Sequence, residues 1–196
     1  MRNRLWSFHP AYLDNESLID TWEFSRKVAT ALRGWMLRRA MPYCRHPALE
    51  RFKACPEPVQ AISDYMHILA DVGRERKLDH GMLFNPGAIP AWRNELGYLT
   101  VTAGQMELET WLYGEILVKE RGGGDAYYDF WSIPEPRPHP LFRVIRGAVE
   151  KWEKLPPHDY TQCRNCGDPI ASTGRGKPAE LCRVCRPGSR AKRVYA

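Results

Sequence analysis

The sequence predicts a mainly α protein with two parts, a compact helical body and a small cysteine-bearing module at the C-terminal end. Three stretches of the body place apolar residues three and four positions apart, which is the spacing of one face of an α-helix. Near the other end of the chain, four cysteines form two pairs with the spacing of metal ligands. We therefore assign residues 1–157 to the helical body and residues 158–196 to the module.

The first predicted helix begins at Asp14 or Asn15, either of which can accept a hydrogen bond from a backbone N–H of the first turn. Apolar residues at helical spacing then predict a buried stripe, made of Leu18, Ile19, Trp22, Ala29 and Leu32. Glu23 lies off this stripe, and Arg26 and Lys27 follow it by three and four residues, so the three charges share one face. This pattern alone is typical of a surface ion pair, and it also suits a charged site.

The second predicted helix opens at Pro56 and Pro58, because proline is tolerated in a first helical turn. Its apolar stripe consists of Val59, Ile62, Met66, Leu69 and Val72, and Gly73 marks its end. Residues 33–47 before it are predicted to include a basic loop. Residues 79–98 after it have no apolar period, which predicts an irregular loop.

The third predicted helix begins at Thr102 and Gln105, which have the spacing of a capping box, and it continues to about residue 120. Its carboxylates are candidates for catalysis, but salt bridges or solvation are the favoured interpretation: Glu107, Glu109 and Glu115. A short aromatic helix is predicted over residues 125–132. Its rings suit core packing better than stacking on a base: Tyr127, Tyr128, Phe130 and Trp131.

The composition predicts a globular protein outside the membrane. Of the residues, 43% are hydrophobic and 11% aromatic, which is enough for a packed core. The sequence has neither an apolar run of membrane-spanning length nor an apolar signal segment at its start, so we expect a cytoplasmic protein.

The net charge of +6 is distributed unevenly, with +5 over residues 1–53, −5 over residues 54–162 and +6 over residues 163–196. Two basic regions on either side of an acidic one suit a polyanion that meets both ends, because released counterions supply much of the affinity for nucleic acid. The alternative is a basic protein without a nucleic-acid ligand.

Three blocks carry a family resemblance: Arg4-Leu5-Trp6-Ser7-Phe8-His9-Pro10-Ala11-Tyr12-Leu13-Asp14, Arg45-His46-Pro47-Ala48-Leu49-Glu50-Arg51-Phe52-Lys53, and Pro136-Arg137-Pro138-His139-Pro140-Leu141-Phe142-Arg143-Val144. A fourth, Leu99-Thr100-Val101-Thr102-Ala103-Gly104-Gln105, lies between the last two. In this order they resemble the pyrimidine-dimer DNA glycosylases of the phage endonuclease V type over roughly residues 4–154. The resemblance implies a compact helical endonuclease V-like body.

The resemblance also implies an enzyme that removes a damaged base and then cleaves the backbone, with the N-terminal α-amine as nucleophile and a glutamate on the first long helix. An α-amine with a pKa near 8 is roughly one-tenth neutral at pH 7, whereas a lysine near 10.4 is neutral less than about a thousandth of the time. Only the neutral amine can attack the sugar and form a Schiff base.

Two positions depart from the family pattern. The block at Arg4 begins two residues later than in the family, so we expect Met1, retained because Arg2 is large, to supply the amine. Counting from Trp6 without gaps, the family's glutamate position falls on Phe24, and Glu23 is one residue away, about 100° around the helix. We take Met1 and Glu23 as the candidate catalytic pair; the alternative is an altered or lost chemistry.

The blocks also supply the side chains expected to bind DNA: Arg2, Arg4, His9, Arg26, Lys27, Arg45, His46, Arg51, Lys53, Arg137, His139 and Arg143. For the three histidines, each of which precedes a proline, a plain structural role is an equally open interpretation. The expected partner is double-stranded DNA, bound by a monomer that flips the target base.

Four cysteines at the C-terminal end form the pattern Cys-X2-Cys, fifteen residues, Cys-X2-Cys: Cys163, Cys166, Cys182 and Cys185. Four thiolates suit a closed tetrahedral site for structural Zn²⁺, and two disulfides are the alternative in an oxidising compartment. The module keeps a positive charge, so it is predicted to bind nucleic acid, although zinc ribbons also bind proteins.

The sequence thus favours a DNA glycosylase with an associated lyase activity on a damaged or modified pyrimidine. A second hypothesis is a non-catalytic or catalytically altered nucleic-acid-binding protein on the same scaffold. A third is an interaction module whose zinc ribbon docks a protein.

Overall fold

The structure is a computed structural model. It describes residues 4–78, 90–91, 93, 97–120, 122, 124–133, 135–153, 160–162, 164–165, 169–171 and 180–181. The elements in chain order are the 3-10 helix η1 (Pro10–Tyr12), α1 (Asn15–Met36), η2 (Pro47–Leu49), α2 (Glu50–Lys53), α3 (Pro58–Glu75), β1 (Leu99–Thr102), α4 (Ala103–Lys119), α5 (Asp125–Ser132), β2 (Phe142–Ile145), β3 (Tyr160–Gln162) and β4 (Pro169–Ala171). The protein is mainly helical, as predicted.

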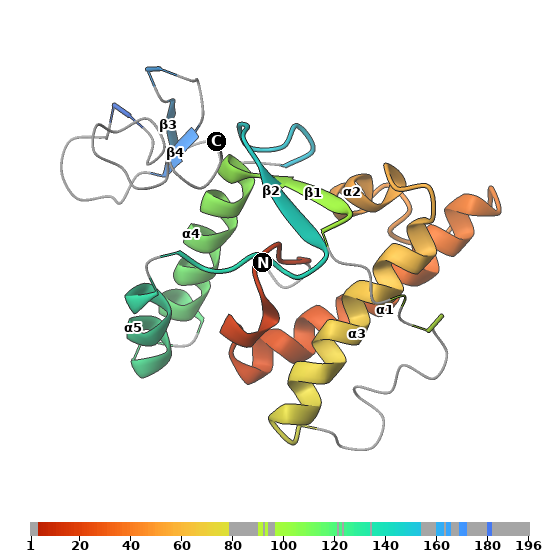
Figure 1. Ribbon diagram of the computed structural model, residues 1–196, viewed down its shortest axis with the longest axis horizontal. Helices are drawn as coiled ribbons and strands as arrows, with labels where there is room; N and C mark the ends of the chain where they lie inside the picture. The colour runs from red at the N-terminus through yellow and green to blue at the C-terminus, as the bar shows by residue number, and fades with distance from the viewer. Residues whose placement is uncertain are drawn as a thin grey trace.

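Helix α1 begins where the sequence predicts, because the Asp14 side chain accepts a hydrogen bond from Ser17 N at 2.6 Å. Four of the five stripe residues are buried, with Leu18 and Leu32 at 0% exposure and Trp22 at 1%, and Ile19 is partly buried. The helix continues to Met36, so Arg33 is helical and does not lie in the loop predicted for it. Helix α1 packs along α3 through this stripe (Figure 1).

Helix α3 begins at Pro58 with the proline in its first turn, as predicted. Most of the predicted loop over residues 79–98 lies outside the described residues. Of the part that is described, Tyr98 donates from its hydroxyl to the buried Asp64 at 2.7 Å, and Arg93 donates from its backbone N–H to the same side chain at 3.3 Å. Asp64 on α3 therefore anchors the chain just before β1.

Helix α4 is capped by Thr102, whose hydroxyl accepts a hydrogen bond from Gln105 N at 3.2 Å. Only half of the predicted capping box forms, because the buried Gln105 side chain donates to two glutamates instead of bonding back to the cap. Helix α5 covers residues 125–132 as predicted, and Phe130 packs in the core against Phe8 and Tyr113.

A parallel pair of short strands, β1 and β2, was not predicted. Leu99 lies opposite Phe142 and Val101 opposite Val144. Four residues carry too little alternation to indicate a strand, and the pairing depends on segments about forty residues apart in the chain. Strands β3 and β4 form a separate antiparallel pair next to α4 (Figure 1).

The core forms around the start of the described chain. Figure 1 shows this segment in the centre of the molecule, between the α1–α3 pair and the α4–α5 pair. Leu5, Trp6 and Phe8 are 2%, 4% and 0% exposed. None of the described helices has both the length and the apolar character that a membrane span requires.

Candidate active site

The N-terminal segment is held by hydrogen bonds from elements far along the chain. Ser7 is fully buried, and its backbone N–H donates to the Glu109 carboxylate on α4 at 2.5 Å. The Ser7 carbonyl accepts from His139 N at 2.6 Å. Because both backbone polar groups of Ser7 have partners, this residue can lie in the apolar core at little cost.

A buried ion pair lies beside Ser7. The Arg51 guanidinium on α2 bonds to the Glu109 carboxylate at 3.0 Å, and their side chains are 3% and 0% exposed. Arg51 also donates to the Ser7 hydroxyl at 2.7 Å, and its guanidinium stacks against the Trp152 ring, with the central carbon 4.8 Å from the ring centroid. The pair is thus fully enclosed, which favours a structural role for Arg51 over the DNA contact predicted for it.

A second pair joins the first described residue to the segment after β2. Arg4 donates two hydrogen bonds to the Glu153 carboxylate, at 2.6 and 2.8 Å. Burial raises the pKa of Glu153, but the hydrogen bonds and charge of Arg4 outweigh burial and hold this pKa below its ordinary value. Gln105 donates to both Glu109 and Glu153, so it connects the two pairs. We call Arg51, Gln105, Glu109 and Glu153 the clamp.

Helix α3 contributes one more contact. The buried Tyr65 hydroxyl donates to the Trp6 carbonyl at 2.9 Å, and the Tyr65 ring stacks on His139 with a centroid distance of 4.3 Å. His139 is fully buried, and burial, reinforced by the positive charges of His9 and Arg51, lowers its pKa to about 3. His139 is therefore neutral at physiological pH and lies inside the core.

The three His-Pro motifs use the same local hydrogen bond. In each, the histidine Nδ1 accepts from the backbone N–H two residues on: Ala11 at 3.1 Å from His9, Ala48 at 3.2 Å from His46 and Leu141 at 3.3 Å from His139. Proline has no N–H, so the next residue supplies the first available donor. Burial, then the charge of Arg137, also lowers the pKa of His9. Each of these histidines thus makes a local backbone contact that suits a structural role, and the DNA contacts expected of them stay predictions.

Glu23 lies in a different environment. It is exposed on α1 and lines a pocket of about 410 Å³ together with Arg26, Lys27 and Thr30. The surface ion pair allowed by the sequence does not form, since within the described residues Glu23 has no ion-pair partner. A carboxylate and two cations are therefore available to a ligand in a pocket of ordinary ligand size.

Phe24, the alternative for the glutamate position, is buried. It is 1% exposed, and its ring contacts His46 at a centroid distance of 5.0 Å and Tyr43 at 6.1 Å. A carboxylate at position 24 would be buried against aromatic rings. The face of α1 that reaches solvent is therefore the face of Glu23, Arg26 and Lys27.

The opposite wall of this pocket comes from the loop after α1, through Met41, Pro42 and Tyr43. Met41 lies directly on Gly34, because a Cβ added to Gly34 would overlap Met41 Cγ. Tyr43 is 39% exposed and has a left-handed backbone, with φ of 65°. This conformation is costly for a non-glycine residue, and it presents the ring beside the charged wall.

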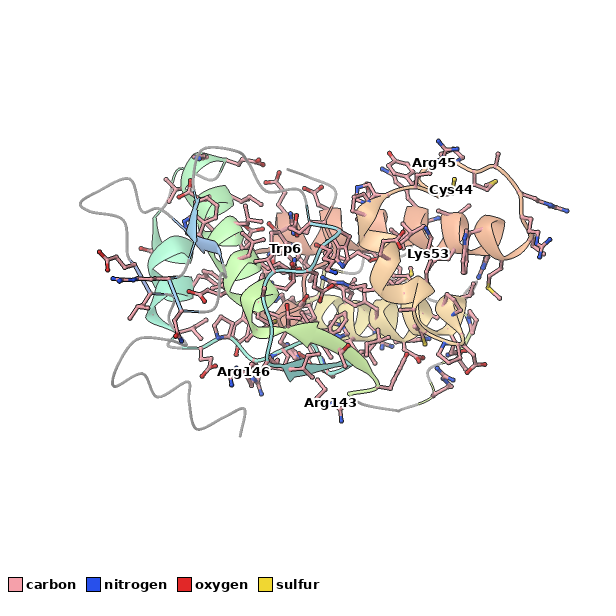
Figure 2. The ribbon with its side chains drawn as sticks, turned by 90° about the horizontal axis from the view of Figure 1, so that it is seen from above. Trp6, Cys44, Arg45, Lys53, Arg143 and Arg146 are labelled. Carbon is pink, nitrogen blue, oxygen red and sulfur yellow. The ribbon has the colours of Figure 1, made fainter. Side chains whose placement is uncertain are left out.

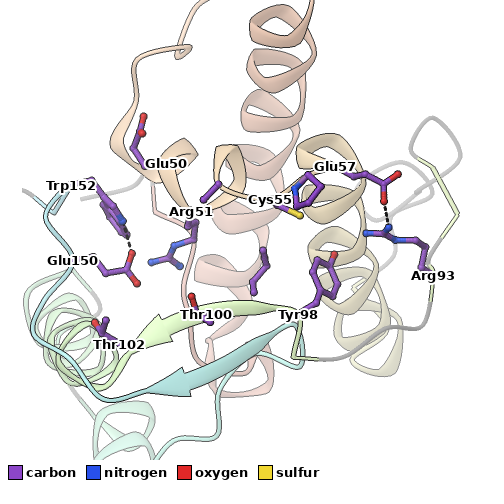
Figure 3. A pocket seen from close by; sticks show the side chains of 13 residues that line it. Glu50, Arg51, Cys55, Glu57, Arg93, Tyr98, Thr100, Thr102, Glu150 and Trp152 are labelled. Atoms are coloured by element: carbon purple, nitrogen blue, oxygen red, sulfur yellow. Dashed lines mark hydrogen bonds and ion pairs between the residues drawn. The ribbon is translucent and has the colours of Figure 1, made fainter.

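A second pocket, of about 550 Å³, lies between α2, β1 and residues 150–152 (Figure 3). Its charged residues are mainly acidic or already paired: Glu50, Arg51, Glu57, Arg93 and Glu150. Arg51 bonds to Glu109 and Arg93 to Glu57, as Figure 3 shows for the latter. The Glu23 pocket is thus the better match for an anionic ligand.

The remaining predicted DNA-binding residues lie on two sides of the body. Figure 2 shows Arg45 and Lys53 at the α2 end and Arg143 on the β2 side, away from them. Lys53 donates to Glu50 at 2.9 Å, whereas Arg45 and Arg143 are exposed. Arg137 is exposed and donates to the Tyr12 hydroxyl. The structure therefore groups Glu23, Arg26 and Lys27 in one pocket and leaves Arg143 outside this group.

Several predicted residues lie outside the described residues. These are Met1 and Arg2 at the start of the chain and the four cysteines of the predicted zinc site, Cys163, Cys166, Cys182 and Cys185. Among the described residues, no group of three or more histidine, cysteine, aspartate or glutamate side chains could hold a metal ion.

The sequence did not predict the clamp, nor the wall of the Glu23 pocket that Met41, Pro42 and Tyr43 form. Gln105 and Glu153 carry no local pattern, since their partners lie tens of residues away. A signal did exist for the wall, because Gly34 interrupts a helical pattern, and an isolated helical glycine often marks a close approach of another segment.

Comparison with known proteins assigns part of the chain. No curated protein and no solved structure matches it. Residues 4–86 match the sequence model of a family described as pyrimidine dimer DNA glycosylase, that is, a family of enzymes that act on DNA. The match includes Glu23, Arg26 and Lys27 and the pocket they line, whereas α4, the segment with Glu153 and the cysteine pairs follow it. Residues 4–86, less than half of this chain, are thus similar to a family of pyrimidine dimer DNA glycosylases.

Proposed function

We propose that this protein is a DNA glycosylase with an associated lyase activity, and that it acts on a damaged or modified pyrimidine. One observation carries the proposal: a carboxylate without an ion-pair partner among the described residues shares a pocket with two cations, within the segment similar to pyrimidine dimer DNA glycosylases. A buried carboxylate paired with arginine, such as Glu109, is a structural element, whereas an accessible one beside unpaired cations suits chemistry on an anionic substrate.

The reaction assigns separate tasks to the amine and the carboxylate. The neutral amine of Met1 attacks the anomeric carbon, the bond from this carbon to the base breaks, and the base leaves with a proton. The sugar ring then opens to a Schiff base. Glu23 stabilises the cationic sugar and accepts the proton from the neighbouring carbon, and the 3′ phosphate leaves in the elimination that follows.

The pocket supplies the contacts that hold a nucleotide. Arg26 and Lys27 lie one turn beyond Glu23 on the same face, where they can neutralise the phosphates on either side of the target. The exposed ring of Tyr43 on the opposite wall offers a stacking surface for a flipped base, because every base has a π-face. Such stacking favours a planar base but does not discriminate between bases. Specificity for one base therefore depends on contacts at the edges of that base.

A structural zinc in the C-terminal module is part of the same proposal. The spacing of Cys163, Cys166, Cys182 and Cys185 supports it. The first pair follows β3 and precedes β4, and these two strands pair with each other. Among the described residues of the module, Arg164 N donates to the Glu180 carbonyl at 2.8 Å. We expect one zinc per chain by elemental analysis, and chelation should unfold the module but not the body.

Covalent trapping on abasic-site DNA tests the enzymatic proposal. Borohydride reduction of the Schiff base should leave the DNA bonded to the first residue, as peptide mapping would show. Glu23→Gln should reduce lyase turnover at least about a hundredfold, the usual contribution of acid–base catalysis, while DNA affinity stays within about twofold. Glu16→Gln, which changes an exposed carboxylate at the start of the same helix, is the matched control and should retain full turnover.

The same experiment separates the alternatives. Trapping that survives acetylation of the N-terminus would indicate that the nucleophile is a lysine. Lys27 is the first candidate, because it shares the pocket with Glu23. Failure to trap abasic DNA, together with no base release from ultraviolet-damaged or hypermodified duplexes, would establish the binding-only function. The offset between Glu23 and the family's glutamate position is the observation that favours this second candidate.

A further inference from the structure

The C-terminal end of α1 exposes three consecutive apolar side chains, which we name the α1 tip: Trp35, Met36 and Leu37. Their exposures are 42%, 54% and 63%, so the tip holds three of the six large hydrophobic residues that are exposed among the described residues. A cluster of this kind on a protein surface usually marks an interaction site.

The tip lies in a strongly basic stretch. No aspartate or glutamate occurs between Glu23 and Glu50, and the stretch contains six lysines and arginines. Arg38, Arg39 and Arg45 are exposed, and in the part of the chain that the structure describes none of the three has an ion-pair partner. The occupant of this surface must therefore combine negative charge with an apolar layer that side chains can enter.

The backbone of the tip is fixed by hydrogen bonds. Leu37 N donates to the Arg33 carbonyl at 3.1 Å, and Arg39 N donates to the Gly34 carbonyl at 2.8 Å. Arg38 between them is left-handed, with φ of 53°, which ends the helix sharply. Met36 and Leu37 are thus presented by a defined turn, and little ordering is needed when they bind a partner.

Of the three tip residues, Leu37 faces the same side as the Glu23 pocket, whereas Met36 lies about 140° away around the helix. Leu37 follows Glu23 by fourteen residues, which places it about 21 Å along the helix axis and within about 40° of the same direction. This separation corresponds to about six base-pair steps of B-DNA at roughly 3.4 Å each. A duplex that brings a nucleotide to Glu23 can therefore run along α1 and reach the tip.

We propose that Leu37 inserts between base pairs of a DNA duplex about six steps from the nucleotide held at Glu23, with Met36 beside it at the end of the helix, while Arg38 and Arg39 bind the flanking phosphates. Apolar wedges of this type unstack one base step and bend the duplex, which lets it contact more of the protein surface. The inference rests on the proposed function for its ligand, DNA, but it does not depend on base removal.

DNA fits these observations better than an anionic membrane surface. A helix that binds in a membrane interface exposes an apolar face along its length. The apolar face of α1 is buried against α3, and only its last turn presents apolar residues to solvent. Three apolar residues that two exposed arginines follow in the chain match a single base step more closely than a lipid layer.

The test uses 2-aminopurine fluorescence in a duplex with a stable tetrahydrofuran abasic analogue. With the full-length protein, we expect fluorescence to rise when the probe base is about six steps from the analogue and to stay low at other positions. The double variant Met36→Ser with Leu37→Ser should abolish this rise and weaken binding about tenfold, which is about 1.4 kcal/mol. Val118→Ser, at an apolar site on α4 that is 43% exposed, is the matched control and should change neither.

The outcomes distinguish this inference from the proposed function. If the rise and the affinity persist in the double variant, the wedge is wrong even where covalent trapping succeeds. If the double variant loses binding to phosphatidylserine vesicles but keeps its DNA affinity, the tip binds membranes and the inference also fails. Loss of the rise in a protein that traps no abasic DNA would support the wedge and reject only the enzymatic proposal. An unchanged unfolding midpoint confirms that the variant is folded.

Discussion

The clamp around the N-terminal segment and the charged face of α1 contain the same residue types in opposite states. In the clamp, Arg51 and Glu109 are 3% and 0% exposed and bond directly to each other. On α1, Glu23, Arg26 and Lys27 share a face but form no ion pair with one another. Arg51 and Glu109 are bonded to each other and stabilise the structure. Glu23, Arg26 and Lys27 are available to a ligand.

This difference follows from the cost of burying charge. Removing one partner from a buried pair leaves an uncompensated charge in a medium that solvates it poorly, so the clamp is expected to be sensitive to substitution. Exposed charges keep their hydration, so changing them alters binding and leaves stability nearly unchanged. Substitutions in the clamp should therefore change stability, whereas substitutions on the charged face of α1 should change binding.

Glu109→Ala should produce the largest loss of stability. It leaves the buried Arg51 guanidinium without its counter-charge and the Ser7 N–H without its acceptor. We expect the free energy of unfolding to fall by about 3–5 kcal/mol in urea titrations. Glu115→Gln on the same helix breaks an exposed pair with Lys119 and should cost less than about 1 kcal/mol. Equal losses in the two variants would refute the contrast.

Acid should destabilise the protein through His139. Its pKa is lowered from 6.5 to about 3 in the folded protein, so only the unfolded chain takes up this proton as the pH falls. The contribution of His139 to the free energy of unfolding is therefore complete above pH 6.5 and is lost progressively below it. The loss is on the order of 3 kcal/mol between pH 7 and pH 4. His139→Gln should flatten the pH dependence of the unfolding free energy in this range. His67→Gln, at a half-buried site on α3, is the control and should leave the slope in place.

Tyr65→Phe should have an intermediate effect. It removes the hydroxyl that donates to the buried Trp6 carbonyl at 2.9 Å and leaves this carbonyl without that partner. A buried carbonyl without a hydrogen-bond partner lowers the free energy of unfolding by about 1–3 kcal/mol. This loss is measurable as a lower urea midpoint with an unchanged m-value. Tyr43→Phe, with a ring that is 39% exposed, should change stability by less than about 0.5 kcal/mol. A silent Tyr65→Phe would show that the segment is held by packing alone.

The smallest effect on stability, and the largest on DNA affinity, is expected on the α1 face. Replacing Arg26 and Lys27 by glutamine should change the unfolding free energy by less than about 0.5 kcal/mol. Binding to duplex DNA should weaken, and the log–log salt slope should decrease by about 0.9 for each phosphate that the variant no longer neutralises. The same replacement at Arg74, which pairs with Asp71, and at Lys77 is the control. An equal slope change in both variants would place the DNA elsewhere on the protein.

Local features of the fold were predictable because their causes are local. Asp14 caps α1, proline opens α3 and Thr102 caps α4, and each involves residues within one helical turn. The buried stripes follow from helical spacing in the same way. The strand pair β1–β2 and the half-formed capping box were not predictable, since the partners of Leu99 and of the Gln105 side chain lie in distant segments.

By itself, the sequence determined which residues share a helical face, including Glu23 with Arg26 and Lys27, and it determined the order of the family-like blocks. Only the tertiary structure decided which charged groups are enclosed and which remain accessible. Ser7 and Glu109 are 102 positions apart, and Arg4 and Glu153 are 149 positions apart. Burial is a property of contacts between such distant segments, so arginine and glutamate residues in one part of the fold became a structural clamp and those on α1 became a candidate active site.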